Sequence, residues 1–479
     1  MLSRNDKVKI VVLVSLFLGF LLSNASKLDR EDFNVIIISL DALRADHLGV
    51  YGYYRNTSLN IDEFASKSTL FDNAIAQATW TIPSHMSLFT SLYPLSHKVI
   101  GPDDVLNENI VTFAETMKKN GYTTAAFTAW GWPLSPKNGL GKGFDLYEQI
   151  DYSKARLEDL KKSSIHYLDE SNPVFGWLKN NKDRKFFLFF HTFSIHDPYI
   201  VSKNYSKIFD PDYDGSILDS EEEYIDLLWN NYIQNYTVEP NEAELIKAVG
   251  DTLVAKTINF SDPRDREHLK AVYDAKILQT DEFIRLFLEK IEKLRLSEKT
   301  IIILLADHGE EFWDHNKLGH GHQLYEETIR VPLIIHNPNM SQGIRIKRQA
   351  QLVDIMPTVL DMLSMKIPDS IQGKSLMPVI LGNPNKDFNE YVFAVNHVDM
   401  FTVRTNEWKL IFRLNGNHEL YNLVSDPKET DNLIEKREEK FIELREKLLE
   451  WDKSTGIKRS EVIAIESVEE KLRKLGYIT

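Results

Sequence analysis

The sequence predicts an α/β fold built around a doubly wound, largely parallel β-sheet, with a small α+β subdomain at its C-terminal end. Continuous apolar runs of strand length recur along the chain, which is typical of strands covered on both faces. Helical patterns separate these runs, and strands that alternate with helices favour a parallel sheet. The length of 479 residues allows about three domains, or one large domain with an appendage.

The predicted strands and helices alternate through the larger part of the chain. The apolar runs that predict strands are 34–40, 123–128, 185–193, 300–306 and 331–336. The periodic patterns that predict helices are 61–66, 84–90, 112–120, 264–294 and 353–363. Residues 199–261 are acidic and rich in Tyr and Asn, and we expect them to form a partly helical cap inserted between two such units.

The pattern changes at about residue 391. Short segments of alternating polarity (YVFAVNH, MFTVRT and WKLIFRL) precede a helical pattern over 435–451, which together predict a small antiparallel sheet with a helix. We therefore divide the chain into an N-terminal segment (1–27), a main domain (28–390) and a C-terminal subdomain with a tail (391–479).

The N-terminal segment has the composition of an export signal. Arg4, Lys7 and Lys9 precede an apolar run over 10–22, and small polar residues follow over 23–26. The run is shorter than the roughly 18 residues of a spanning helix, so a cleaved signal and an uncleaved anchor both fit, and a buried helix is the remaining alternative. The basic flank places the rest of the chain outside the cytoplasm, as a secreted protein or one anchored to the outer face of the cytoplasmic membrane.

The composition excludes several classes of function. With 57 basic and 71 acidic residues the net charge is −14, so the chain has no basic excess to neutralise nucleic-acid phosphates. It contains no cysteine, which excludes disulfides, thiolate zinc sites, iron–sulfur clusters and cysteine nucleophiles.

Polar side chains stand at three predicted strand ends, where ligands bind in open α/β sheets. Asp41, His196 and the pair Asp307-His308 each follow an apolar run, and His191 lies at the end of one. Any one of them fits a structural role, but acids and histidines at three strand ends predict a common site.

A hydroxyl lies between these strand ends in the sequence. In the segment ATWTIPSH (78–85), Thr81 stands at or just before the start of a predicted helix. There it faces the positive end of the helix dipole, where an alkoxide or a bound oxyanion is stabilised. A Thr-x-Pro-Ser pattern found alone would indicate an ordinary helix cap.

Together these segments resemble the sulfatase branch of the alkaline-phosphatase superfamily, from about residue 34 to the C-terminus. SLDALRADHLGVYGY resembles the opening metal-ligand strand, TWTIPSHMSLFTSLYP the nucleophile element, and LLADHGEEFWDH with GHGHQLYEETIRVPLII the second metal segment. TVRTNEWKLIFRLNGNHELYNLVSDPKETDNL resembles the closing subdomain, and the ending LRKLGYIT is typical of one bacterial and archaeal subgroup. The resemblance implies an alkaline-phosphatase-like fold and a metal-dependent ester hydrolase.

The sequence departs from the family pattern at four positions. Thr81 stands where sulfatases carry the Cys or Ser that becomes formylglycine, and a secondary hydroxyl cannot be oxidised to that aldehyde. Threonine is the nucleophile in phosphodiesterase and phosphotransferase relatives, so the resemblance implies this role for Thr81. His85 replaces an Arg, and we expect it to hydrogen-bond the nucleophile or the substrate. Ala42 replaces the second acid after Asp41, and His308 replaces the Asn of calcium-binding sulfatases.

The resemblance also implies a metal site. Its ligands would be Asp41, Thr81, Asp307 and His308. Three oxygens and one nitrogen favour zinc or manganese, whereas calcium takes six to eight oxygens; water ligands could complete a calcium or magnesium shell. His320 and His322 would either join a second metal or contact the substrate oxyanion. No Asp-x-x-x-His pattern completes a second site, so we expect one divalent metal ion.

Other side chains at family positions are candidates for substrate contact. His196, in IHDPY, matches the histidine that approaches the transferred oxyanion, and we expect a general acid or an electrostatic clamp. Arg44 is a candidate for substrate binding, with a structural ion pair as the alternative; the same alternative applies to Arg330. Glu310 would support the metal site or begin a helix.

The expected function is an extracytoplasmic, metal-dependent hydrolase that cleaves phosphate, sulfate or phosphonate esters through a covalent Thr81 intermediate. One alternative is a transferase that passes a phosphoryl-containing group to a lipid or glycan alcohol. Another is a non-catalytic binding protein on the same scaffold. The expected partner is an anionic ester, with no nucleic acid and with a membrane contact only through the N-terminal segment.

Overall fold

The computed structural model describes residues 33–129, 134–150, 168–197, 199–215, 217, 262–383, 388–396 and 399–455. A large sheet runs through the molecule in the strand order β11-β2-β10-β6-β1-β5-β3-β4, with the short β9 paired to β2. Its strands are β1 (Asn34–Leu40), β2 (Thr69–Ile75), β3 (Thr123–Ala129), β4 (Leu146–Ile150), β5 (Phe186–Thr192), β6 (Thr300–Leu305), β9 (Arg330–Val331), β10 (Leu333–His336) and β11 (Ile344–Gln351).

The centre of this sheet is parallel. β1 pairs in parallel with β5 and β6, so that Ile37 lies between Phe189 and Ile303. Every residue of β1 is buried, which explains why its sequence is continuously apolar and does not alternate. Among the described strands of the sheet, β9 and β10 alone run against their neighbours. The predicted, largely parallel sheet is confirmed.

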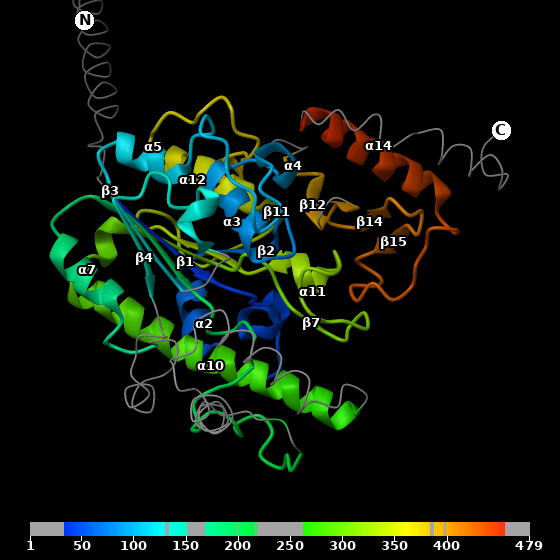
Figure 1. Ribbon diagram of the computed structural model, residues 1–479, viewed down its shortest axis with the longest axis horizontal. Coiled ribbons are helices and arrows are strands. Elements are labelled where there is room, and N and C mark those ends of the chain that lie inside the picture. Colours follow the sequence, from blue (N-terminus) through cyan, green and yellow to red (C-terminus); the bar gives the residue numbers. More distant parts are fainter. Residues whose placement is uncertain are drawn as a thin grey trace, which may run out of the picture.

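Helices cover both faces of the sheet (Figure 1), as in a doubly wound fold. α2, α7 and α10 lie on one face, and α3, α5 and α12 lie on the other. The helices are α2 (Leu59–Ser66), α3 (Thr81–Thr90), α4 (Pro94–His97), α5 (Phe113–Lys119), α7 (Pro173–Asn181), α10 (Pro263–Lys293), α11 (Glu326–Ile329), α12 (Ile355–Met362), α13 (Met377–Ile380) and α14 (Glu438–Ser454).

The sequence does not predict β2, β4 or β11. β2 (TLFDNAI) and β11 (IRIKRQAQ) are only partly buried, and their polar residues interrupt the apolar run. Continuous apolarity identifies strands that are covered on both faces, whereas these strands lie toward the two edges of the sheet.

α3 begins at Thr81, three residues before the predicted start. Trp80 caps the helix with an extended backbone (φ −159°), and Pro83 falls in the first turn, where a missing N–H costs no intrahelical hydrogen bond. His85 therefore lies one helical turn after Thr81, on the same side of the helix.

The C-terminal part forms the predicted small subdomain. Its antiparallel strands, in the order β12-β13-β14-β15, are β12 (Val392–Asn396), β13 (Met400–Arg404), β14 (Trp408–Arg413) and β15 (Glu419–Asn422). α14 packs against β13 and β14 through an apolar cluster that includes Phe401, Leu410 and Leu444. Figure 1 shows this unit beside the end of the large sheet that carries β2 and β11.

Some predictions fall outside the described residues. These are the N-terminal segment over 1–27, residues 218–261 of the predicted cap, and the tail after residue 455. The described part of the cap, 199–215, consists of turns and loops. A search of the described helices for one long and apolar enough to cross a membrane found none.

Candidate functional site

The parallel strands bring the predicted site residues to one edge of the sheet. Ser39 of β1 lies opposite both His191 of β5 and Leu305 of β6, so the residues that follow β1 and β6 emerge side by side. Asp41 and Asp307 are therefore neighbours, and both are buried.

Four side chains, which we call the metal group, converge there: Asp41, Thr81, Asp307 and His308. The Nε2 atom of His308 lies 3.4 Å from Oδ1 of Asp41, 3.4 Å from Oδ2 of Asp307 and 3.4 Å from the Thr81 hydroxyl. Their arrangement is that of side chains around a common central point, as the sequence predicts.

The unsatisfied atoms of the metal group indicate a cation. Oδ1 of Asp41 and Oδ2 of Asp307 are buried without a hydrogen-bond partner among the described residues, which is costly for a carboxylate unless a positive charge is supplied. Burial and the nearby Asp307 raise the pKa of Asp41 to about 6. Nδ1 of His308 lies 2.8 Å from the Gly309 carbonyl oxygen, to which it donates, so Nε2 keeps its lone pair for a ligand bond. The residues present fit a divalent cation.

Thr81 is fixed in the metal group by the first turn of α3. It is the first residue of that helix and is 2% exposed. The Ser84 hydroxyl donates to the backbone carbonyl of Asp307 at 2.6 Å and so ties the same turn to the end of β6. The hydroxyl of Thr81 thus faces the ligands of the metal group from the positive end of a helix.

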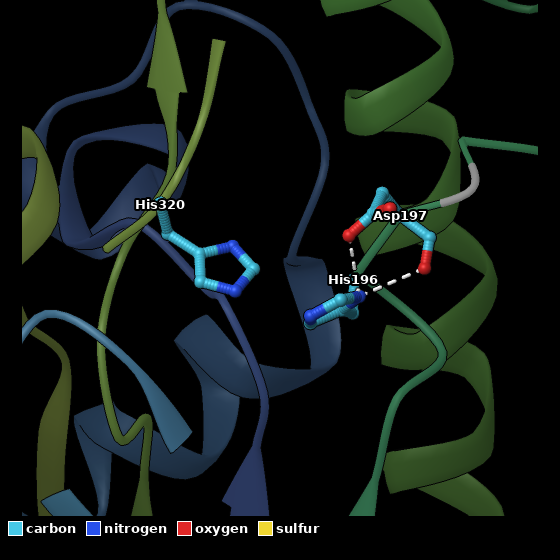
Figure 2. Close-up of side chains that lie close together, drawn as sticks. All are labelled: His196, Asp197 and His320. Atoms are coloured by element: carbon cyan, nitrogen blue, oxygen red, sulfur yellow. Dashed lines mark hydrogen bonds and ion pairs between the residues drawn. The ribbon is translucent and has the colours of Figure 1, made fainter. Parts of the chain in front are cut away.

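Two more histidines extend from the metal group, and we call His196 and His320 the oxyanion clamp. The ring of His320 lies 4.4 Å from that of His308 and 4.7 Å from that of His196, measured between ring centroids. Figure 2 shows the two clamp rings beside each other and steeply tilted, with 68° between their planes, and Asp197 bonded to His196 on the side away from His320.

Each ring of the clamp is backed by a carboxylate. Nδ1 of His196 lies 2.7 Å from Asp197, and Nδ1 of His320 lies 2.9 Å from Glu310. Burial disfavours the His196 cation, but Asp197 outweighs this and raises its pKa to about 10. Burial opposes the His320 cation as well, and Glu310 raises its pKa above the usual value. His196 is therefore an imidazolium at neutral pH, and the carboxylate behind His320 favours the cation of that ring too, an arrangement that suits an oxyanion.

The donor atoms of His196, Asp197 and His320 also lie within 4.8 Å of one another, close enough for a second metal. The carboxylates occupy Nδ1 of each ring, however, so neither of these two nitrogens is open to a cation. This arrangement favours an anion between protonated rings over a second cation.

His85 does not contact the Thr81 hydroxyl. Its Nδ1 lies 2.9 Å from the backbone carbonyl oxygen of Thr81, and its Nε2 lies 3.0 Å from the Ser39 hydroxyl. Both ring nitrogens are bonded inside the protein and the residue is fully buried. His85 thus reaches the predicted nucleophile only through the backbone of Thr81, and a contact with the substrate stays a prediction. The sequence does not reveal this contact, because the predicted helix starts at residue 84. The spacing of one helical turn between Thr81 and His85 is then not recognised.

Arg44 is also bonded within the protein. Its guanidinium pairs with Asp46 and with Asp314, each at 2.8 Å, and donates to the Glu310 carbonyl at 3.1 Å. Through these bonds Arg44 joins the loop after β1 to the segment after β6, as the structural alternative expects. A contact of Arg44 with the substrate stays a prediction. Arg330 likewise donates to a backbone carbonyl, that of Asp72.

His322 lies outside both sets of converging side chains. Its side chain is exposed, and neither of the two possible ligand groups among the described residues includes it. A role for His322 in substrate binding stays a prediction.

The segment that carries Asp307, His308 and His320 is held by the C-terminal subdomain. The Gly309 and Glu310 amides donate to the Thr328 and Glu327 carbonyls, and a Cβ on Gly309 would lie 2.0 Å from the Glu327 carbonyl oxygen. The neighbouring Glu326 is anchored by ion pairs. Four residues take part, and we call them the ion cluster: Glu326, Arg404, Lys409 and Glu429.

The ion cluster is tightly bonded. Arg404 contacts both carboxylate oxygens of Glu326 at 2.9 Å, and the fully buried Lys409 lies 3.2 Å from Glu326 and 2.9 Å from Glu429. The Glu326 amide donates to Glu429 at 2.7 Å. Sequence reasoning missed this cluster, because charges on short strands look solvent-exposed until the fold brings the two segments together.

Comparisons with known proteins agree with this architecture. The family model described as Sulfatase matches residues 33–365, and one described as N-sulphoglucosamine sulphohydrolase, C-terminal, matches residues 315–454. An ulvan-active sulfatase from Formosa agariphila is 25% identical over 438 residues, which cover 85% of this chain and 78% of that protein. An arylsulfatase from Clostridium perfringens is 25% identical over 459 residues, which cover 85% of this chain and 91% of that protein.

The fold is shared with solved structures as well. The phosphonate monoester hydrolase of Agrobacterium radiobacter superposes with a TM-score of 0.72 at 19% identity, over 88% of this chain and 96% of that one. The matched sulfatase model spans well over half of the chain and contains Asp41, Thr81, Asp307 and His308. The chain therefore belongs to the sulfatase family of the alkaline-phosphatase superfamily, a family of ester hydrolases.

Proposed function

We propose that this chain is an extracytoplasmic, metal-dependent hydrolase that cleaves phosphate or related oxyanion esters through a covalent intermediate on Thr81. One observation carries the proposal: the Thr81 hydroxyl lies 3.4 Å from Nε2 of His308, among buried carboxylates and at the N-terminal end of α3. A cation held by Thr81 and the three other residues of the metal group would activate a hydroxyl in this position, and the helix dipole would add to that effect.

The metal group would hold one divalent cation. When bound, that cation lowers the pKa of the Thr81 hydroxyl and stabilises charge on the group being transferred. The donor set of three oxygens and one imidazole nitrogen favours zinc or manganese over calcium. One cation suffices, because the protonated clamp supplies the positive charge on the other side of the site.

The reaction uses the protein groups in two displacements. Deprotonated Oγ1 of Thr81 attacks phosphorus, a bond forms between them, and the bond to the leaving alcohol oxygen breaks. The imidazolium of His320 donates to an equatorial oxygen, and His196 gives its proton to the leaving oxygen. Water then attacks phosphorus and gives a proton to His196, and the bond to Oγ1 breaks so that Thr81 is restored.

The proposed nucleophile, Thr81, and the name of one structural neighbour favour a phosphorus ester as the substrate. A secondary hydroxyl cannot become formylglycine, and the chain has no cysteine that could serve instead. The Agrobacterium radiobacter neighbour is named a phosphonate monoester hydrolase, whereas the sequence relatives are named sulfatases. The extracytoplasmic location rests on the basic and apolar N-terminal segment.

A substrate and metal panel tests the proposal. The full chain, loaded in turn with zinc, manganese, magnesium or calcium, is assayed on phosphate monoesters, phosphate diesters, phosphonate esters and sulfate esters. We expect phosphorus esters to turn over fastest, with zinc or manganese. An added alcohol separates the alternatives, because a transferase would leave the phosphoryl group on it. Failure to bind any divalent metal would contradict the proposal.

The raised pKa of His196 in the oxyanion clamp predicts that activity falls at high pH. Because His196 is expected to act as a cation with a pKa of about 10, kcat/KM should be full below that value and fall as the pH rises through it. In Asp197→Asn the carboxylate that raises this pKa is gone, so the fall should move to lower pH. The measurement is kcat/KM against pH for both proteins.

A control and a second substrate sharpen this test. Asp72→Asn removes a carboxylate that pairs with Arg345, outside the site, and should leave the profile unchanged. If His196 is the general acid, kcat/KM of His196→Gln should fall more for esters with poor leaving groups than for nitrophenyl esters. If His196 is only an electrostatic clamp, kcat/KM should fall equally for both kinds of ester. An unmoved alkaline limb in Asp197→Asn would contradict the assignment.

A further inference from the structure

Two buried histidines lie directly behind the metal group, and we call them the histidine floor: His191 on β5 and His85 on α3. Their rings stand nearly perpendicular, with centroids 5.2 Å apart, and both residues are fully buried. Burial lowers the pKa of both, and that of His191 to about 3. The acceptor atoms next to each ring determine which of its nitrogens carries a proton.

His191 fixes one oxygen of Asp41. Its Nε2 lies 2.8 Å from Oδ2 of Asp41, and because an ionised carboxylate only accepts, the proton of His191 is on Nε2. The other nitrogen, Nδ1, has no partner. The rings of His85 and Phe193 pack against His191 at centroid distances of 5.2 and 4.6 Å and hold its orientation.

His85 fixes the second oxygen donor, Thr81, by a hydrogen bond to the backbone carbonyl of Thr81. The Thr81 carbonyl only accepts, so the proton of His85 is on Nδ1 and its Nε2 accepts from the Ser39 hydroxyl. Ser39 stands opposite His191 in the sheet register. The histidine floor thus supports both oxygen donors, Asp41 and Thr81.

The floor limits how many ligands the site offers. With Oδ2 of Asp41 held by His191, only Oδ1 faces the cation position, and Oδ1 of Asp307 accepts from the Ala42 amide at 3.4 Å. Each carboxylate therefore has one oxygen without a hydrogen-bond partner among the described residues, although Oδ2 of Asp307 lies 3.4 Å from Nδ1 of His85, and Ala42 has no side-chain oxygen to add. The set stays at four donors, which is the number that zinc takes in proteins and fewer than the roughly six to eight oxygens that calcium takes.

We propose that His191 is the positioning residue that sets the metal preference of this site, by holding Asp41 to a single metal-facing oxygen. Without that hydrogen bond Asp41 can turn and offer both oxygens, which suits larger cations with more ligands. The inference rests on the proposed function and adds to it a residue that selects the metal without touching it.

Metal binding by the full chain tests this. Dissociation constants for zinc and for calcium are measured by competition titration on the wild type, His191→Leu and His191→Gln. Loss of a hydrogen bond behind a ligand costs 10–100-fold in metal affinity, so we expect His191→Leu to lose about that factor for zinc and to bind calcium relatively better. His191→Gln, whose amide can donate to the same oxygen, should stay close to the wild type.

His97→Leu is the matched control. His97 is also buried, has its pKa lowered to about 3, and bonds Ser87 and the Val99 amide next to α3 without touching the metal group. Its loss should leave both dissociation constants unchanged. An unchanged zinc-to-calcium ratio in His191→Leu, or a His191→Gln variant that behaves like His191→Leu, would overturn the inference.

X-ray absorption of zinc bound to the wild type gives a second readout that needs no variant. Four ligands, with each carboxylate bound through one oxygen, are expected, and a fifth or sixth protein oxygen would overturn the inference. If these tests fail while Thr81-dependent hydrolysis persists, the proposed function stands and His191 does not select the metal. If the wild type binds no divalent cation, both fail.

Discussion

Replacing Thr81 by alanine is expected to lower kcat by at least about 10³-fold, because the variant has no oxygen to attack phosphorus or to complete the metal group. Thr81→Ser keeps a hydroxyl at the same point and should retain most of the activity. The measurement is steady-state hydrolysis of the best ester in the panel, with the metal at saturation.

Two further observations separate a lost nucleophile from a damaged fold. Thr90→Ala removes a buried hydroxyl at the other end of α3, where it donates to the Met86 carbonyl, and should leave kcat close to that of the wild type. Mass spectrometry of acid-quenched wild type should find a phosphoryl group on the peptide that contains Thr81. Metal-stimulated hydrolysis that persists in Thr81→Ala would exclude the covalent mechanism.

Replacing Lys409 by methionine is expected to have the second largest effect. Lys409 is fully buried and pairs with both carboxylates of the ion cluster, so its loss leaves Glu326 and Glu429 without their shared cation. Breaking a buried ion pair from one side costs about 3–5 kcal/mol of the free energy of unfolding. Burial already raises the pKa of Glu429 to about 7, which shows that Lys409 does not fully offset its desolvation.

The same change should also lower kcat. Glu326 adjoins the Glu327 and Thr328 carbonyls that hold Gly309 and Glu310, so a shift of α11 moves His308 and the carboxylate behind His320. Misplacement by about 1 Å can cost a factor of about 10². Urea unfolding gives the stability, and kcat is measured well below the unfolding midpoint.

Controls distinguish coupling from general loss of stability. Leu444→Ala on α14 should cost about 2–5 kcal/mol by leaving a cavity, with kcat per folded molecule unchanged, because Leu444 packs away from Glu326. Lys436→Met breaks an exposed pair with Asp431 and should cost less than about 1 kcal/mol. Adding Glu429→Gln to Lys409→Met should recover stability by removing an unpaired charge. A loss below about 1 kcal/mol in Lys409→Met would contradict this account.

The parts of the fold that could be predicted are those whose burial is complete. β1 and β6 are covered on both faces, so apolarity alone reveals them, and the polar residue after each points to the site. β11 mixes Arg, Lys and Gln with apolar residues because one side of it is solvated, and no continuous run marks it.

The site residues also divide into those whose place could be predicted from the sequence and those whose place could not. Asp41, Thr81, Asp307 and His308 are brought together as predicted, since strand ends and a helix start fix their places. The roles of Arg44 and His85 depend on which neighbour each side chain reaches, and a change of partner by a few ångströms reverses the assignment. His191 is visible in the sequence as a strand-end histidine, but its bond to Asp41 follows only from the register of β1 with β5.

The histidine floor also restricts the routes by which this sequence can change. His85 fills a fully buried position between Ser39, His191 and the Phe189 ring. An arginine there, as in the formylglycine element, would need space and partners for five donors and a permanent charge. Under the proposed mechanism, replacing Thr81 by cysteine alone would therefore leave neither a working threonine nor a complete formylglycine element. Exchange between the two chemistries on this scaffold requires concerted substitutions in which the order of the steps matters.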